Sequence, residues 1–196
     1  MLWGLHIDGL EVREEGGETR LSGRFPYGQE TVLREAGDGG PELREVFAPR
    51  AFGMHVNHQN RNVHLLAGHD FAKPLASVGA GTLDLSDTPD ALLIEARIVP
   101  ALSGVSYIAD LVAGIRAGLV PGVSPGFRVV RSLPNAETVE RRGNVILRTI
   151  REALLEEVSI VTRPAYPQSQ IEARSWQCAQ ETEIARRREA SIMRYR

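Results

Sequence analysis

Residues 154–161 form the stretch Leu-Leu-Glu-Glu-Val-Ser-Ile-Val. Its length and its β-branched content predict one strand. Alternation along the strand places Glu157 and Ser159 on one face, together with Leu155 and Val161. A carboxylate on a half-buried face needs a partner, and a histidine is one option. The alternative is an edge strand whose Glu157 lies in solvent.

Other strand patterns lie on the N-terminal side of this stretch. Short apolar or alternating runs, separated by turn signals, predict strands within residues 2–26, 63–66, 76–85, 91–99, 123–130 and 145–150. One helix is predicted over residues 103–119, where apolar side chains recur on one helical face. No βαβ repetition is present, so we expect an α+β fold, mainly an antiparallel β-barrel with flanking helices.

The C-terminal residues differ in character from the rest of the chain. Residues 175–196 are polar and contain the basic run Arg186-Arg187-Arg188. We therefore expect one domain over residues 1–174 and a polar tail over residues 175–196, helical or disordered.

Composition limits the classes of function. The chain has 196 residues, a net charge of −2 and one cysteine, Cys178. A general electrostatic nucleic-acid binder should carry a basic excess, and a disulfide framework or cysteine-rich zinc site needs more cysteines. There is no apolar run near the roughly 20 residues of a membrane span and no signal-peptide pattern. We expect a soluble intracellular protein without a cofactor, bound neither to nucleic acid nor to a membrane.

Four of the five histidines fall in one stretch: His55, His58, His64 and His69. One interpretation is a metal-dependent hydrolase, with Asp70 as a further ligand. Another is a single catalytic histidine, because imidazole titrates near neutral pH. The third is a polar turn region without a chemical role.

Residues 122–127 read Gly-Val-Ser-Pro-Gly-Phe and place a small nucleophile between glycines. The Gly-x-Ser-x-Gly spacing suits a sharp turn that exposes the Ser124 hydroxyl. The segment does not follow a clean strand and open a helix, so the α/β-hydrolase context is missing. A loop serine is the alternative.

Six motifs occur in a fixed order between about Leu21 and Arg174. They are residues 46–52 (VFAPRAF), 65–70 (LLAGHD), 73–76 (KPLA), 117–119 (AGL), 123–127 (VSPGF) and 155–165 (LEEVSIVTRPA). This ordered set resembles the prohead (procapsid) maturation proteases of tailed bacteriophages, which are serine proteases similar in fold to herpesvirus assemblin. The segment 73–76 departs from the family, which tends to have Pro-Ile-Gly there.

The resemblance implies Ser124 as nucleophile, His69 as general base and Glu157 as third member of a triad. The herpesvirus relatives use a second histidine as third member, so the other clustered histidines and Asp70 remain alternatives. Pro125 has no N–H, so an oxyanion donor must come from elsewhere, for example from Gly126 or a separate loop.

The resemblance also implies a biological setting. The expected enzyme is a serine endopeptidase inside the viral procapsid, in the host bacterial cytoplasm. Its substrates would be scaffold protein, the scaffolding segment of the major capsid protein, and often the protease itself. A homodimer or higher oligomer is compatible with this role. The alternatives are a non-catalytic assembly component with a protease-like fold and the metal-dependent hydrolase.

Overall fold

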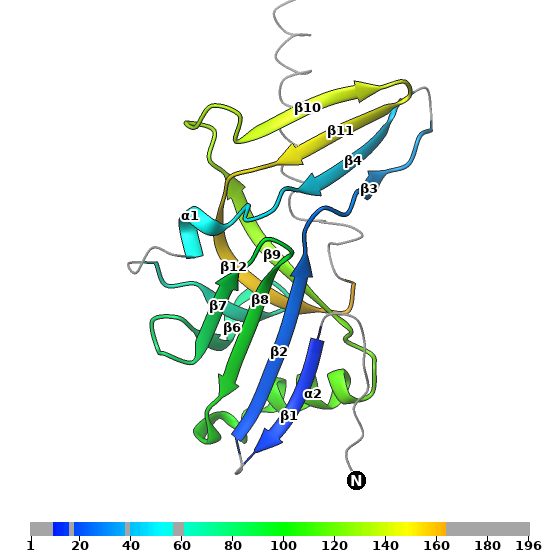
Figure 1. Cartoon of the computed structure of the whole chain (residues 1–196). Coiled ribbons are helices and arrows are strands. Elements are labelled where there is room, and N and C mark those ends of the chain that lie inside the picture. Colours follow the sequence, from blue (N-terminus) through cyan, green and yellow to red (C-terminus); the bar gives the residue numbers. More distant parts are fainter. Residues whose placement is uncertain (1–9, 16–17, 38–39, 57–60, 164–196) are drawn as a thin grey trace, which may run out of the picture.

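The computed structural model describes residues 10–15, 18–37, 40–56 and 61–163 of the chain. In this part the chain forms three sheets of four strands each. Figure 1 shows the sheet of β3, β4, β10 and β11 at one end of the molecule and helix α2 at the other, with β9 and β12 running between them. The expected tail over residues 175–196 lies outside the described residues, and so does the end of the expected domain.

The first sheet has the order β1-β2-β8-β7 and is antiparallel throughout. Its strands are β1 (Leu10–Glu15), β2 (Glu18–Pro26), β7 (Leu83–Asp87) and β8 (Ala91–Ile98).

The second sheet has the order β10-β11-β4-β3, in which β11 and β4 are parallel. Its strands are β3 (Thr31–Arg34), β4 (Glu42–Phe47), β10 (Glu137–Arg142) and β11 (Val145–Ile150).

The third sheet carries the candidate site and has the order β6-β5-β12-β9. Its strands are β5 (His64–Ala67), β6 (Asp70–Ser77), β9 (Gly122–Val129) and β12 (Ala153–Val161). The strand β12, which contains residues 154–161, lies between a parallel neighbour, β5, and an antiparallel neighbour, β9. Its last five residues are all buried, as expected for an interior strand.

The expected α+β character is confirmed in its β-rich form, but the expected barrel is wrong. Within the described residues each sheet keeps two edge strands and none closes on itself. Two strand pairs are parallel rather than antiparallel. Alternation in a sequence reports which face of a strand is buried, and it does not report which strand pairs with which. The pattern therefore predicted several of the strands, but it missed β3, β4 and β10 and did not give the order of the strands.

The described helices are few and short. They are α1 (Gly53–Val56), α2 (Ser106–Arg116) and a 3-10 turn over Pro100–Leu102. The face of α2 that contains Ile108, Val112 and Ile115 is buried, as its spacing predicts. The described residues contain no helix long and apolar enough to cross a membrane.

Aromatic rings join the sheets at the centre of the molecule. Four of the five phenylalanines, Phe25, Phe47, Phe52 and Phe127, are buried together with ring centroids 4.8–6.2 Å apart. They come from β2, β4, the segment before α1, and β9, so this cluster fixes β9 against the other two sheets. The fifth, Phe71, is 66% exposed.

Candidate active site

The turn between β5 and β6 carries His69. Gly68 and His69 both have positive φ, 65° and 61°, as a two-residue hairpin turn of the primed type requires. Histidine is one of the few side chains that adopts this conformation at modest cost. The turn places the imidazole beside β12, at the end of the third sheet.

The His69 imidazole binds the carboxylate of Glu157. Nδ1 lies 2.7 Å from Oε1, and the two side chains are 22% and 5% exposed. An ionised carboxylate only accepts hydrogen bonds, so Nδ1 carries a proton, and in the neutral imidazole Nε2 presents a lone pair. Glu157 is therefore buried and bound to His69. The alternative, an edge strand with Glu157 in solvent, is wrong.

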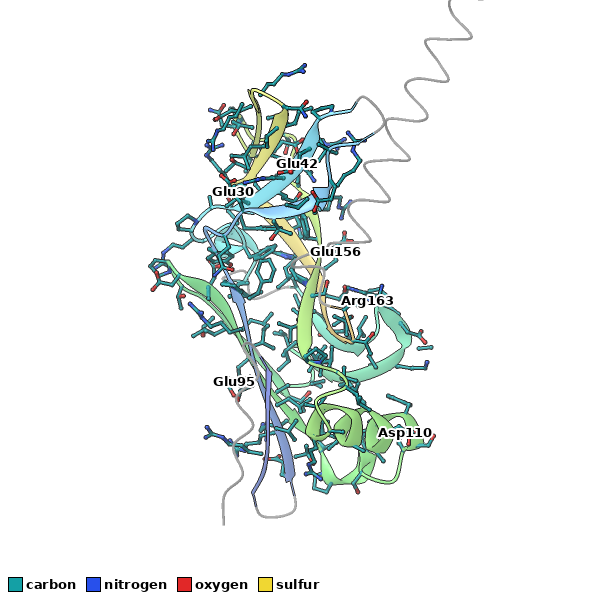
Figure 2. The ribbon with its side chains drawn as sticks, turned by 90° about the vertical axis from the view of Figure 1, so that its right-hand side faces the viewer. Glu30, Glu42, Glu95, Asp110, Glu156 and Arg163 are labelled. Carbon is teal, nitrogen blue, oxygen red and sulfur yellow. The ribbon has the colours of Figure 1, made fainter. Side chains whose placement is uncertain are left out.

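A β-bulge in β12 sets the direction of Glu157. Leu155 pairs with Phe127 of β9, whereas Glu157 pairs with the next residue, Gly126. Glu156 is the extra residue of the bulge, and it lies on the surface, paired with Arg128 (Figure 2). Because neighbouring residues of β9 face opposite sides, the bulge turns Glu157 away from the face of Leu155. The expected alternation, which put the two on one face, is thus wrong at this point.

Ser124 lies in the middle of β9, directly across from Ser159 of β12. Gly122, Ser124 and Gly126 alternate along the strand, so they share the face of Glu157 and Ser159. The expected sharp turn is therefore wrong, and the glycines keep a strand face free of bulk. Ser124 is 1% exposed, and its Oγ makes no hydrogen bond among the described residues.

The Gly-Val-Ser-Pro-Gly segment also explains the position of the carboxylate. A Cβ on Gly126 would lie 2.1 Å from Glu157 Oε1, the oxygen that binds the imidazole. Only glycine leaves this space. Pro125 points to the opposite face, and β9 is an edge strand, where a missing N–H is tolerated.

The other candidate residues lie differently. Asp70 accepts a hydrogen bond from the N–H of Ala72 at 2.9 Å, which with Lys73 holds the pKa of its carboxyl below the usual range. His55 is buried on α1, and His64 lies on β5 beside Glu157. His58 lies outside the described residues. In residues 61–163 and the other described ranges, no three His, Cys, Asp or Glu side chains are grouped to hold a metal ion.

Ser159 is the residue that the sequence did not single out as part of the site. Its Oγ lies 2.9 Å from the backbone N of His69 and 2.5 Å from Glu157 Oε2. The spacing of two residues from Glu157 was the available signal, since it predicts a shared face. His69, Glu157 and Ser124 are all neighbours of this one side chain.

Comparison with known proteins gives one match. A family model described as caudovirus prohead serine protease matches residues 11–183. No curated protein and no solved structure matches the chain.

Proposed function

This chain belongs to the caudovirus prohead serine protease family and is a serine peptidase, and we propose that Ser124, His69 and Glu157 are its catalytic triad. The observation that carries the proposal is the 2.7 Å contact between His69 Nδ1 and Glu157 Oε1, beside a buried serine hydroxyl that has no hydrogen-bond partner in the described residues. A nucleophile, a base and an orienting carboxylate are the three members of a serine-protease triad.

The chemistry follows from the proton positions. Nδ1–H is held by Glu157, so Nε2 of His69 takes the proton from Ser124 as Oγ attacks the carbonyl carbon of the scissile peptide. The imidazolium then gives this proton to the leaving amine as the C–N bond breaks and an acyl-enzyme forms. Water repeats the sequence, which releases the acid and restores the Ser124 hydroxyl. Glu157 stabilises the charged imidazole in each half of the reaction.

Access to Ser124 is part of this mechanism. The side chain is 1% exposed, so a peptide carbonyl reaches Oγ only once the groups above it give way. Pro125 cannot donate to the oxyanion, since it has no N–H. The first oxyanion donor to test is the backbone N–H of Gly126, the next residue of β9.

The family places the activity in phage head maturation. The substrates that fit this setting are the scaffold protein, the scaffolding segment of the major capsid protein, and the protease itself. Cleavage would occur inside the procapsid, within the host cell.

Cleavage of the cognate capsid and scaffold proteins tests the triad. Wild type, Ser124→Ala and the control Ser77→Ala are incubated with both proteins and followed on a gel. Ser77 is a suitable control because it is a buried serine of the same sheet whose Oγ accepts a hydrogen bond from Ala80. We expect cleavage by wild type and Ser77→Ala only. Equal cleavage by Ser124→Ala would exclude the serine mechanism, and no cleavage by any protein would favour a non-catalytic role in assembly.

A further inference from the structure

Ser159 makes two hydrogen bonds inside the site. It is fully buried, accepts the N–H of His69 at 2.9 Å and donates its own proton to Glu157 Oε2 at 2.5 Å. The direction is fixed, because a backbone N–H only donates and an ionised carboxylate only accepts. This single hydroxyl therefore connects the backbone of one member of the triad to the side chain of another.

We propose that Ser159 is a positioning residue that sets His69 and Glu157 as one rigid unit. The inference rests on the proposed triad. Glu157 uses Oε1 for the imidazole and Oε2 for Ser159, so its carboxylate plane is held at both oxygens. Without the second bond, the carboxylate could rotate away from Nδ1.

The backbone of His69 gives the second argument. A non-glycine residue at a φ of 61° is held there by its surroundings. Two backbone N–H groups of this turn bind β12: Gly68 N donates to Ile160 O at 3.0 Å, and His69 N donates to Ser159 Oγ. The first bond is main chain to main chain and survives any substitution at Ser159. Loss of the second bond should therefore loosen the imidazole without releasing the turn.

The third argument concerns which groups accept the hydroxyl protons of Ser159 and Ser124. Ser159 and Ser124 are opposite each other on one sheet face. Because the proton of Ser159 is used by Glu157, it is not shared with Ser124. The hydroxyl of Ser124 is then left for His69 Nε2.

Three variants separate a positioning role from packing. Ser159→Ala removes the hydroxyl, Ser159→Cys keeps the volume with a weak donor, and Ser159→Thr keeps the hydroxyl. We expect kcat to fall about tenfold to a hundredfold in the Ala and Cys variants, with KM nearly unchanged, and to return in the Thr variant to within a few-fold of wild type. The matched control is Ser77→Ala, for which wild-type kcat is expected.

The pH profile provides a readout that packing would not move. The acid limb of kcat/KM follows protonation of the catalytic base. In Ser159→Ala the carboxylate of Glu157 is no longer held against Nδ1, so the protonated imidazole loses part of its stabilisation and we expect this limb to move to lower pH. In Ser159→Thr the limb should stay in place.

Two results would overturn the inference. One is a Ser159→Ala enzyme with wild-type kcat and pH profile, and the other is a Thr variant no better than the Cys variant at equal folded fraction. Both leave the triad intact as long as Ser124→Ala is inactive. Cleavage by Ser124→Ala would instead reject the triad itself, so the two failures are distinguishable.

Discussion

Two sheets of the molecule each bury a glutamate against a basic partner. In the third sheet Glu157 binds His69 at 2.7 Å, and in the second sheet Glu45 binds Arg148 at 2.8 Å. The side chains of Glu45 and Arg148 are 0% and 4% exposed, and both residues sit on adjacent parallel strands. The guanidinium also binds Glu137 at 2.9 Å.

The difference between the pairs lies in what surrounds the carboxylate. Arg148 is permanently charged and its fork is taken up by two glutamates, so this pair can only hold β4 and β11 in register. An imidazole exchanges a proton near neutral pH, which a guanidinium does not. His69 stands on the turn between β5 and β6 and binds Glu157, which lies on the sheet face of Ser124. A buried carboxylate alone thus says little about function, whereas a titratable partner near a serine hydroxyl is what the proposed triad requires.

The largest expected effect comes from neutralising each glutamate in turn. Glu157→Gln should lower kcat by about 10⁴-fold, because an amide can stabilise the wrong imidazole tautomer, while the fold is kept. Glu45→Gln should leave kcat per folded molecule unchanged and lower the free energy of unfolding by about 3–5 kcal/mol. Cleavage kinetics and urea denaturation on both variants measure the two effects. Near-wild-type turnover in Glu157→Gln would make another histidine or Asp70 the better third member.

The next effect concerns the space reserved for Glu157. In Gly126→Ala the new Cβ displaces Oε1 from its position 2.1 Å away, which separates it from the imidazole. We expect a loss in kcat of at least about a hundredfold, the cost of misplacing a catalytic group by about 1 Å. Gly104→Ala is the matched control, since nothing lies within 4 Å of its added Cβ. Equal activity of the two variants would show that the carboxylate can move without cost.

A smaller effect distinguishes the two opposed serines by stability. Ser124→Ala removes a buried hydroxyl without a partner in the described residues and should raise the free energy of unfolding by up to about 1 kcal/mol. Ser159→Ala leaves the N–H of His69 and Oε2 of Glu157 unsatisfied and should lower it by about 1–3 kcal/mol. Thermal unfolding of both variants tests the opposite signs. Destabilisation of equal size would mean that Ser124 has a partner in solution.

The sequence predicted several strands and the candidate site residues. It did not predict the bulge in β12 or the need for a glycine at position 126, and the reasons are physical. Several strands came from local alternation, and the candidates Ser124, His69 and Glu157 came from the ordered set of motifs and the family resemblance that it carries. The structure places all three next to Ser159. The bulge at Glu156 could not be predicted, because period-two alternation assumes that no residue is extra. The need for a glycine at position 126 could not be predicted either, because it depends on the carboxylate of Glu157, which comes from another strand.

The smallest effect concerns Asp87, a third partly buried carboxylate. The guanidinium of Arg50 donates to the backbone carbonyl of Asp87, and its charge only partly offsets the effect of burial on the carboxyl pKa. Asp87 accepts a hydrogen bond from the hydroxyl of Tyr27, and burial raises the pKa of Asp87 above its ordinary value. Burial and the charge of Asp87 likewise raise the pKa of Glu152. Such groups bind protons more tightly when folded, so stability is fully present below the ordinary carboxyl pKa and falls as pH rises from there to the raised value. We expect Asp87→Asn to weaken this fall in melting temperature as pH rises above about 4, the ordinary carboxyl pKa, and Glu152→Gln to weaken it less. An unchanged pH dependence in both variants would show that burial does not raise the pKa of these two carboxyls. A partly buried carboxylate in this fold would then need neither a histidine nor an arginine bound to it.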